Sequence, residues 1–69
     1  MKVSYDSEAD AAYIKLSDET PNGGTELGEG IILHSTQDNR IVAIEILDVS
    51  KKFSVEELYR FEVERAEAA

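Results

Sequence analysis

The sequence has no cysteine, a single proline and few basic residues. Without cysteine the chain cannot form a disulfide, a thiolate metal site or a cysteine nucleophile, so packing alone must hold the fold. The 7 lysine and arginine residues stand against 15 aspartate and glutamate residues, which gives a formal net charge of -8. Because such an acidic surface repels a phosphate backbone, we expect no nucleic-acid partner.

Long apolar runs are also missing. No stretch approaches the ~20 apolar residues that a membrane-spanning helix requires. The first six residues, Met-Lys-Val-Ser-Tyr-Asp, lack the apolar region of a secretory signal. We therefore expect a cytoplasmic protein with no membrane partner.

The length and composition describe a small folded domain. The 69 residues are 42% hydrophobic and 32% charged, which is typical of a globular chain and predicts a single domain over residues 1–69. Below about 70 to 80 residues a hydrophobic core is marginal unless a partner adds buried area. Size alone therefore predicts a homo-oligomer, with a dimer as the first expectation.

Four segments alternate between apolar and polar residues, as β-strands do. Residues 18–25 separate the second from the third and hold the only proline, so they predict an exposed loop. Asp38 and Asn39 tolerate the positive φ of a tight turn and predict a hairpin between the last two strands. The predicted strands cover residues 2–5, 11–17, 26–35 and 41–47.

Two features of the later strands are unusual. Gly28-Glu29-Gly30 lies inside the predicted third strand, and we interpret it as a bulge or close approach. As a phosphate loop it would be a weak motif, because no lysine is adjacent and no helix follows. The fourth strand is apolar on both faces, which indicates that one face is covered by something other than this chain.

The C-terminal third favours a helix. Ser54 can cap it and Glu57 can complete a capping box. Apolar residues then share one broad arc at 100° per residue, which predicts an amphipathic helix over about residues 54–66. The predicted fold is α+β: a four-stranded antiparallel meander over about residues 2–47, with the single C-terminal helix packed on the sheet.

Three blocks carry a resemblance to a known family, in order along the chain: Tyr5 to Leu16, Gly28 to Leu33 and Ile44 to Lys51. Over roughly residues 1–52 the sequence resembles the YuzE-like family of short prokaryotic proteins, a domain of unknown function. The resemblance implies a compact α+β domain with an antiparallel sheet and no established reaction, and it transfers no catalytic, cofactor-binding or metal-binding residue. Members are similar to the small antitoxin-like proteins that accompany basic ribonuclease-type toxins.

An acidic turn is the first candidate for chemistry. Asp6, Glu8 and Asp10 alternate as the ligands at the start of a calcium loop do. The glycine expected at the sixth position is missing, and Ser17 stands where a bidentate glutamate would close the loop. We therefore favour a structural turn in which Asp6 accepts hydrogen bonds from backbone N–H groups, with the metal site as the less favoured alternative.

His34 is the only imidazole, near the end of the predicted third strand. A general base needs a nucleophile or an orienting carboxylate, and Ser35 and Glu45 are generic candidates. A solvated or cross-strand-paired histidine is the simpler interpretation. Glu45 would be a candidate acid if buried among its aliphatic neighbours, but alternation favours the outer face, opposite Lys15.

The basic residues of the C-terminal third are Lys51, Lys52, Arg60 and Arg65. They are diluted by carboxylates and form no stripe for nucleic acid, so we interpret them as part of a solvated face and linker.

The sequence leaves two functions open. The first is a non-catalytic protein-interaction module, in its most specific form antitoxin-like, that docks a basic partner protein through its acidic surface and an apolar face. The second is a small enzyme, or a metal-binding or ligand-binding protein, that uses Asp6, Glu8, Asp10 and His34 at a subunit interface. No cofactor is expected on the first reading.

Overall fold

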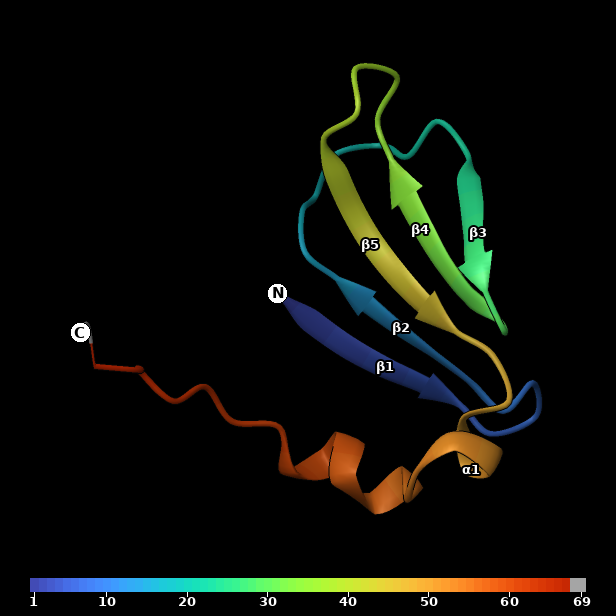
Figure 1. The fold of residues 1–69 in the computed structure, drawn as a ribbon, viewed down its shortest axis with the longest axis vertical. Coiled ribbons are helices and arrows are strands. Elements are labelled where there is room, and N and C mark those ends of the chain that lie inside the picture. Colours follow the sequence, from blue (N-terminus) through green and yellow to red (C-terminus); the bar gives the residue numbers. More distant parts are fainter. Residues whose placement is uncertain (68–69) are drawn as a thin grey trace.

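The body of the protein is a five-stranded antiparallel sheet (Figure 1). A computed structural model describes residues 1–67. The strand order across the sheet is β1-β2-β5-β4-β3, and every neighbouring pair is antiparallel. The strands are β1 (Lys2–Asp6), β2 (Ala11–Lys15), β3 (Gly24–Gly28), β4 (Ile31–Ser35) and β5 (Ile41–Ile46). The α+β class predicted from the sequence is confirmed, since short helical segments follow the sheet.

Tight turns join β1 to β2 and β4 to β5. In the first, the Asp6 carboxylate accepts hydrogen bonds from the backbone N–H groups of Glu8 at 3.0 Å and Ala9 at 3.3 Å. This confirms the structural turn favoured from the sequence. In the second, Asn39 has the positive φ of 66° that the hairpin prediction required.

The predicted third strand, 26–35, is wrong in extent, because the chain reverses in its middle. Glu29 and Gly30 both have positive φ, 49° and 78°, as in the mirror-image turns that match strand twist in two-residue hairpins. The predicted bulge is present as well, as a register shift between Glu26 and Gly28. The sheet therefore has five strands instead of four.

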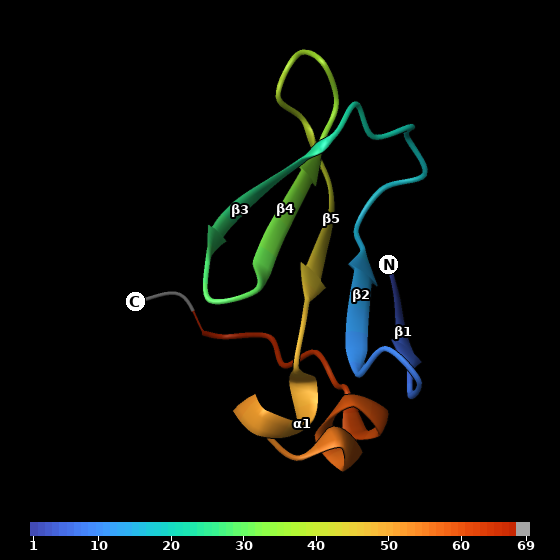
Figure 2. The ribbon, with the colours of Figure 1, turned by 90° about the vertical axis from the view of Figure 1, so that its right-hand side faces the viewer.

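The predicted meander is also wrong. The segment after β2 crosses to the far edge of the sheet to form β3, and the chain returns through β4 so that β5 pairs with both β2 and β4 (Figures 1 and 2). The reason lies in β5, whose Val42 and Ala43 point to opposite faces and are both fully buried. A strand that is apolar on both faces is most stable at the centre of a sheet, where neighbours flank it on both sides.

The predicted helix over 54–66 does not form as such. The structure has a single α-helical turn, α1 (Val49–Lys52), and a 3₁₀ helix, η1 (Val55–Arg60), and residues 61–67 form neither helix nor strand. The Ser54 side chain makes no capping hydrogen bond. Tyr59, Phe61 and Val63 recur at every second residue, which is the period of a strand and does not sustain a helix.

The helical segments lie beyond one end of the sheet, near the ends of β1 and β5, and do not cover a face (Figure 2). Within residues 1–67, no helix has the length and apolar character needed to cross a membrane.

The core is correspondingly small. The fully buried apolar side chains are Ala12, Val42, Ala43 and Val49. Strand register aligns Val3, Ile14, Ile44 and Leu33 in a row across one side of the sheet, and Tyr5, Ala12, Ile46 and Ile31 in the next row. We call this side the apolar face. Most of its side chains are only partly buried, and the expectation that something other than this chain covers one face stays a prediction.

Candidate functional site

The opposite side of the sheet, which we call the polar face, carries two of the candidate residues, His34 and Glu45. The register places Ser4, Tyr13, Glu45, Ile32 and Glu26 in one row across all five strands. The next row contains Lys2, Lys15, Ala43, His34 and Gly24. The alternation of side chains along each strand therefore brings residues from distant parts of the sequence onto one surface.

His34 and Glu45 form the central pair of this face. Nε2 of His34 lies 3.0 Å from Oε1 of Glu45, and the two side chains are 20% and 30% exposed. The Tyr13 ring lies beside the imidazole, with the centroids 5.6 Å apart and the planes at 55°. The cross-strand-paired histidine favoured from the sequence is confirmed, and the partner of Glu45 is His34, since Lys15 instead contacts Asp18 at 3.2 Å.

Gly24 makes room for the imidazole. A Cβ atom at this position would lie 3.0 Å from Cε1 of His34 and 2.9 Å from Cγ2 of Ile32. Contacts this short would displace one of the two side chains. The glycine on the edge strand therefore sets the position of the histidine, a role that the sequence did not indicate.

A histidine held by a carboxylate is half of an acid–base arrangement. The other half would be a nucleophile within hydrogen-bond distance of the imidazole. In the part of the chain that the structure describes, no hydrogen bond joins the side chain of Ser35 to His34. One hollow of about 130 Å³ is lined by residues that include Lys2, Lys15 and Asp18, and another of about 580 Å³ by residues that include Leu27, Ile31 and Lys52. His34 and Glu45 line neither of them. The geometry thus resembles an open binding surface more than an enclosed catalytic site.

Asp10 in the acidic turn links β1 and α1 by hydrogen bonds. Asp10 accepts hydrogen bonds from the Tyr5 hydroxyl at 2.7 Å, the Ser50 hydroxyl at 2.6 Å and the Ser50 backbone N–H at 3.1 Å. The bonds from Ser50, followed by that from Tyr5, lower the pKa of the Asp10 carboxyl, and the bond to Asp10 raises the pKa of the Tyr5 hydroxyl. Asp10 therefore fastens α1 to the turn between β1 and β2.

The candidate metal ligands do not converge. Asp6 binds backbone N–H groups, Asp10 binds Tyr5 and Ser50, and His34 lies on β4 beside Glu45. Among residues 1–67, no group of three or more His, Cys, Asp or Glu side chains is arranged to hold a metal ion.

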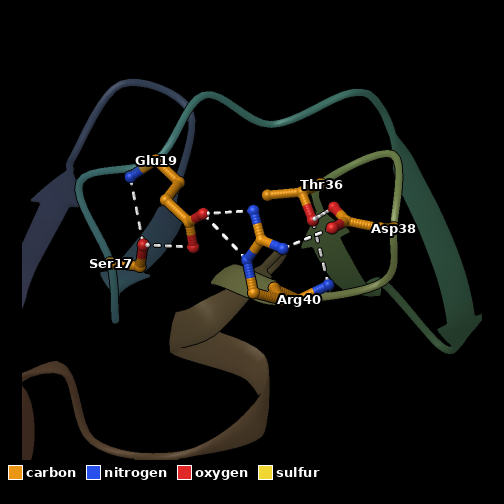
Figure 3. Close-up of polar contacts among 5 residues, drawn as sticks. All are labelled: Ser17, Glu19, Thr36, Asp38 and Arg40. Carbon is orange, nitrogen blue, oxygen red and sulfur yellow. Dashed lines mark hydrogen bonds and ion pairs between the residues drawn. The ribbon is translucent and has the colours of Figure 1, made fainter.

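A second charged cluster, missed in the sequence, joins two loops (Figure 3). The Arg40 guanidinium donates to Oε1 of Glu19 from Nε at 2.9 Å and from Nη2 at 2.6 Å, and its Nη1 contacts Asp38. Ser17 and Thr36 orient the two carboxylates. Arg40 lowers the pKa of Glu19. The hydrogen bond from Thr36, followed by a backbone hydrogen bond at Asp38 and then by Arg40, lowers the pKa of Asp38. No pattern in the sequence links residues 21 positions apart, so only the strand order could reveal this contact.

These contacts shape the electrostatics of the surface. Arg40, Lys15 and Arg60 each contact a carboxylate of their own chain. By contrast, Glu26 on β3 is exposed at the edge of the polar face. The whole chain has a formal net charge of -8, and several of its cations are paired with its own carboxylates. The polar face is therefore part of a strongly acidic molecule.

Comparison with known proteins gives a family and one relative. A family model described as "Protein of unknown function (DUF2283)" matches residues 2–50. A protein of Methanosarcina mazei named "Putative hypoxanthine phosphoribosyltransferase" is 39% identical over 54 residues, which cover 78% of this chain and 43% of that protein. The chain thus spans less than half the length of this curated relative. No solved structure matches.

Proposed function

The chain belongs to the family of proteins of unknown function described as DUF2283, and from this premise we propose that it is a non-catalytic protein-interaction module that docks a basic partner protein in the cytoplasm. The most specific form of the proposal is an antitoxin-like role, in which the acidic protein covers a basic toxin. The matched region, residues 2–50, contains the whole sheet and both of its faces.

The carboxylates on the polar face, one exposed at Glu26 and one partly exposed at Glu45, are the observation that carries this proposal. Glu26 and Glu45 lie in the same row, one on an exposed edge strand and the other paired with His34. A partner's lysine or arginine side chains would meet carboxylates on a surface that belongs to a chain of net charge -8. Such complementarity raises the association rate and selects basic partners over acidic ones.

The alternative, a small enzyme or a metal-binding or ligand-binding protein, has less support. Asp6, Glu8, Asp10 and His34 would have to share a site, and Asp10 and His34 are engaged in separate contacts. The name of the Methanosarcina mazei relative describes a protein of which this chain covers 43%, so it adds no argument for the alternative.

A pull-down from the native host tests the proposal. We expect the tagged chain to retain a small basic protein in stoichiometric amount at low salt, and to release it as salt screens the contact. The double variant Glu26→Gln and Glu45→Gln should lose this protein, because it removes two charges from the polar face. The matched control, Glu56→Gln and Glu57→Gln, removes two charges from η1 and should retain it. Retention of the same protein by both double variants would contradict the assignment to the polar face.

A further inference from the structure

The C-terminal arm, residues 59–67, has the sequence pattern of a β-strand, although its first two residues, Tyr59 and Arg60, are the last residues of η1. Apolar Tyr59, Phe61 and Val63 alternate with charged Arg60, Glu62 and Glu64. The three apolar side chains are 75%, 55% and 80% exposed. Phe61, the residue after η1, has φ -57° and ψ 126°, outside the helical region, and the arm contains neither proline nor glycine. The arm can therefore offer a row of backbone hydrogen-bonding groups and one apolar side.

Strand β1 is a regular edge of the sheet. It pairs with β2 alone, without a register shift, and it places Val3 and Tyr5 on the apolar face. The other edge, β3, is interrupted by a bulge and has glycine at both ends. A bulged edge resists strand addition, whereas a straight one invites it.

We propose that the arm of one copy adds as an antiparallel strand to β1 of a second copy, and that the exchange is reciprocal. With Phe61 beside Tyr5 and Val63 beside Val3, the apolar residues of the arm extend the apolar face of the second copy. The same antiparallel register places the charged residues on the other side of the arm opposite the polar-face residues of β1. Arg60 lies opposite Asp6 once the last residues of η1 unwind, Glu62 lies opposite Ser4 and Glu64 lies opposite Lys2.

The charges select this direction. A parallel arm centred on the same residues would place Arg60 beside Lys2 and Glu64 beside Asp6, and like charges directly opposite each other destabilise a strand pair. The antiparallel arrangement turns both contacts into opposite-charge pairs. The charge pattern of β1, positive at Lys2 and negative at Asp6, is therefore complementary to that of an antiparallel arm.

The exposed area fits a second copy of the chain as the occupant. The chain exposes 5493 Å², whereas a compact monomer of this mass exposes about 4,300 Å². The excess is more than the ~800 Å² per partner that a stable interface buries. In both views residues 61–67 leave η1 in a direction away from β1 of their own chain, which favours exchange over folding back (Figures 1 and 2).

Sedimentation equilibrium of the purified full-length chain tests the proposal. We expect a dimer that Glu64→Lys or Lys2→Glu weakens about tenfold or more, because each change turns two symmetry-related pairs into repulsions. The double variant, Lys2→Glu with Glu64→Lys, should restore the wild-type dimer. Glu56→Lys changes the charge equally on η1, outside the arm, and should leave dimerisation as it is in the wild type.

Three outcomes would overturn the exchange. The chain could be a monomer at roughly millimolar concentration, or it could form a dimer that no exchange of Lys2 and Glu64 weakens and restores. In the third outcome, hydrogen exchange protects the outer amides of β1 in a monomer, which would place the arm on its own sheet. No basic partner enters these measurements, so their failure is separate from failure of the proposed docking function.

Discussion

Asp10 shows how much a single side chain does in a core this small. It stands at a positive φ of 53°, ends the turn after β1 and binds Ser50, which lies 40 positions further along the chain. Its hydrogen bonds lower the pKa of its carboxyl below the usual value of 3.8, so the ionised form is favoured in the folded state. Asp10, a candidate metal ligand in the sequence, therefore joins the sheet to α1 through hydrogen bonds.

The lowered pKa of Asp10 predicts acid sensitivity. Because the folded state holds this carboxyl ionised more strongly than the unfolded state does, its stabilising contribution is present above the usual value of 3.8 and is lost as the pH falls through the folded-state pKa. Ser50→Ala removes the main cause of the shift and should make the melting temperature less dependent on pH in this range. Thermal unfolding followed by circular dichroism, at pH values between about 2 and 6, measures the pH dependence of the melting temperature across the range in which Asp10 becomes protonated. Ser54→Ala, whose side chain makes no capping bond, is the control, and equal pH dependence in the two variants would contradict the prediction.

The hairpin between β3 and β4 depends on the Glu29-Gly30 turn. Glutamate tolerates a φ of 49° poorly, whereas asparagine before glycine is the preferred pair for such a turn. We expect Glu29→Asn to raise the free energy of unfolding by about 0.5 to 1 kcal/mol, measured by urea denaturation. Glu26→Asn, in the adjacent strand, should give no gain because asparagine is a poor strand former. A gain of equal size in both variants would mean that removal of negative charge, not turn geometry, is responsible.

The elements were predictable where their signals were local. Alternation located the strands, and Asp38-Asn39 located a turn that the structure contains. The Gly28-Glu29-Gly30 segment was misread because glycine marks a bulge and a turn with equal strength, and here it forms both. The arm was misread because its apolar residues also fit the broad arc of a helix when the whole 54–66 segment is averaged.

The arrangement of the whole molecule was less accessible from the sequence. His34 and Glu45 were both candidates, but their contact depends on β5 lying beside β4. Tyr13 and Gly24 join the same surface only because β2 is the other neighbour of β5 and β3 pairs with β4. Strand order is a property of long-range pairing, which periodicity within a segment does not encode. The polar face therefore becomes evident only in the structure, although the sequence indicates His34 and Glu45 as candidates.

The small core and the exposed area together predict that stability depends on concentration. Only four apolar side chains are fully buried among residues 1–67, and two of them are alanine. If the arm completes the sheet of a second copy, unfolding is coupled to dissociation, so the melting temperature must rise with protein concentration. A hundredfold increase should raise it by roughly 5 to 10 °C, as measured by scanning calorimetry or circular dichroism. Phe61→Asp, which places a charge where the arm would meet Tyr5, should reduce that rise, whereas Phe53→Asp lies outside the arm and should preserve it. A melting temperature that is the same at every concentration would show that the single chain supplies all of its own stability.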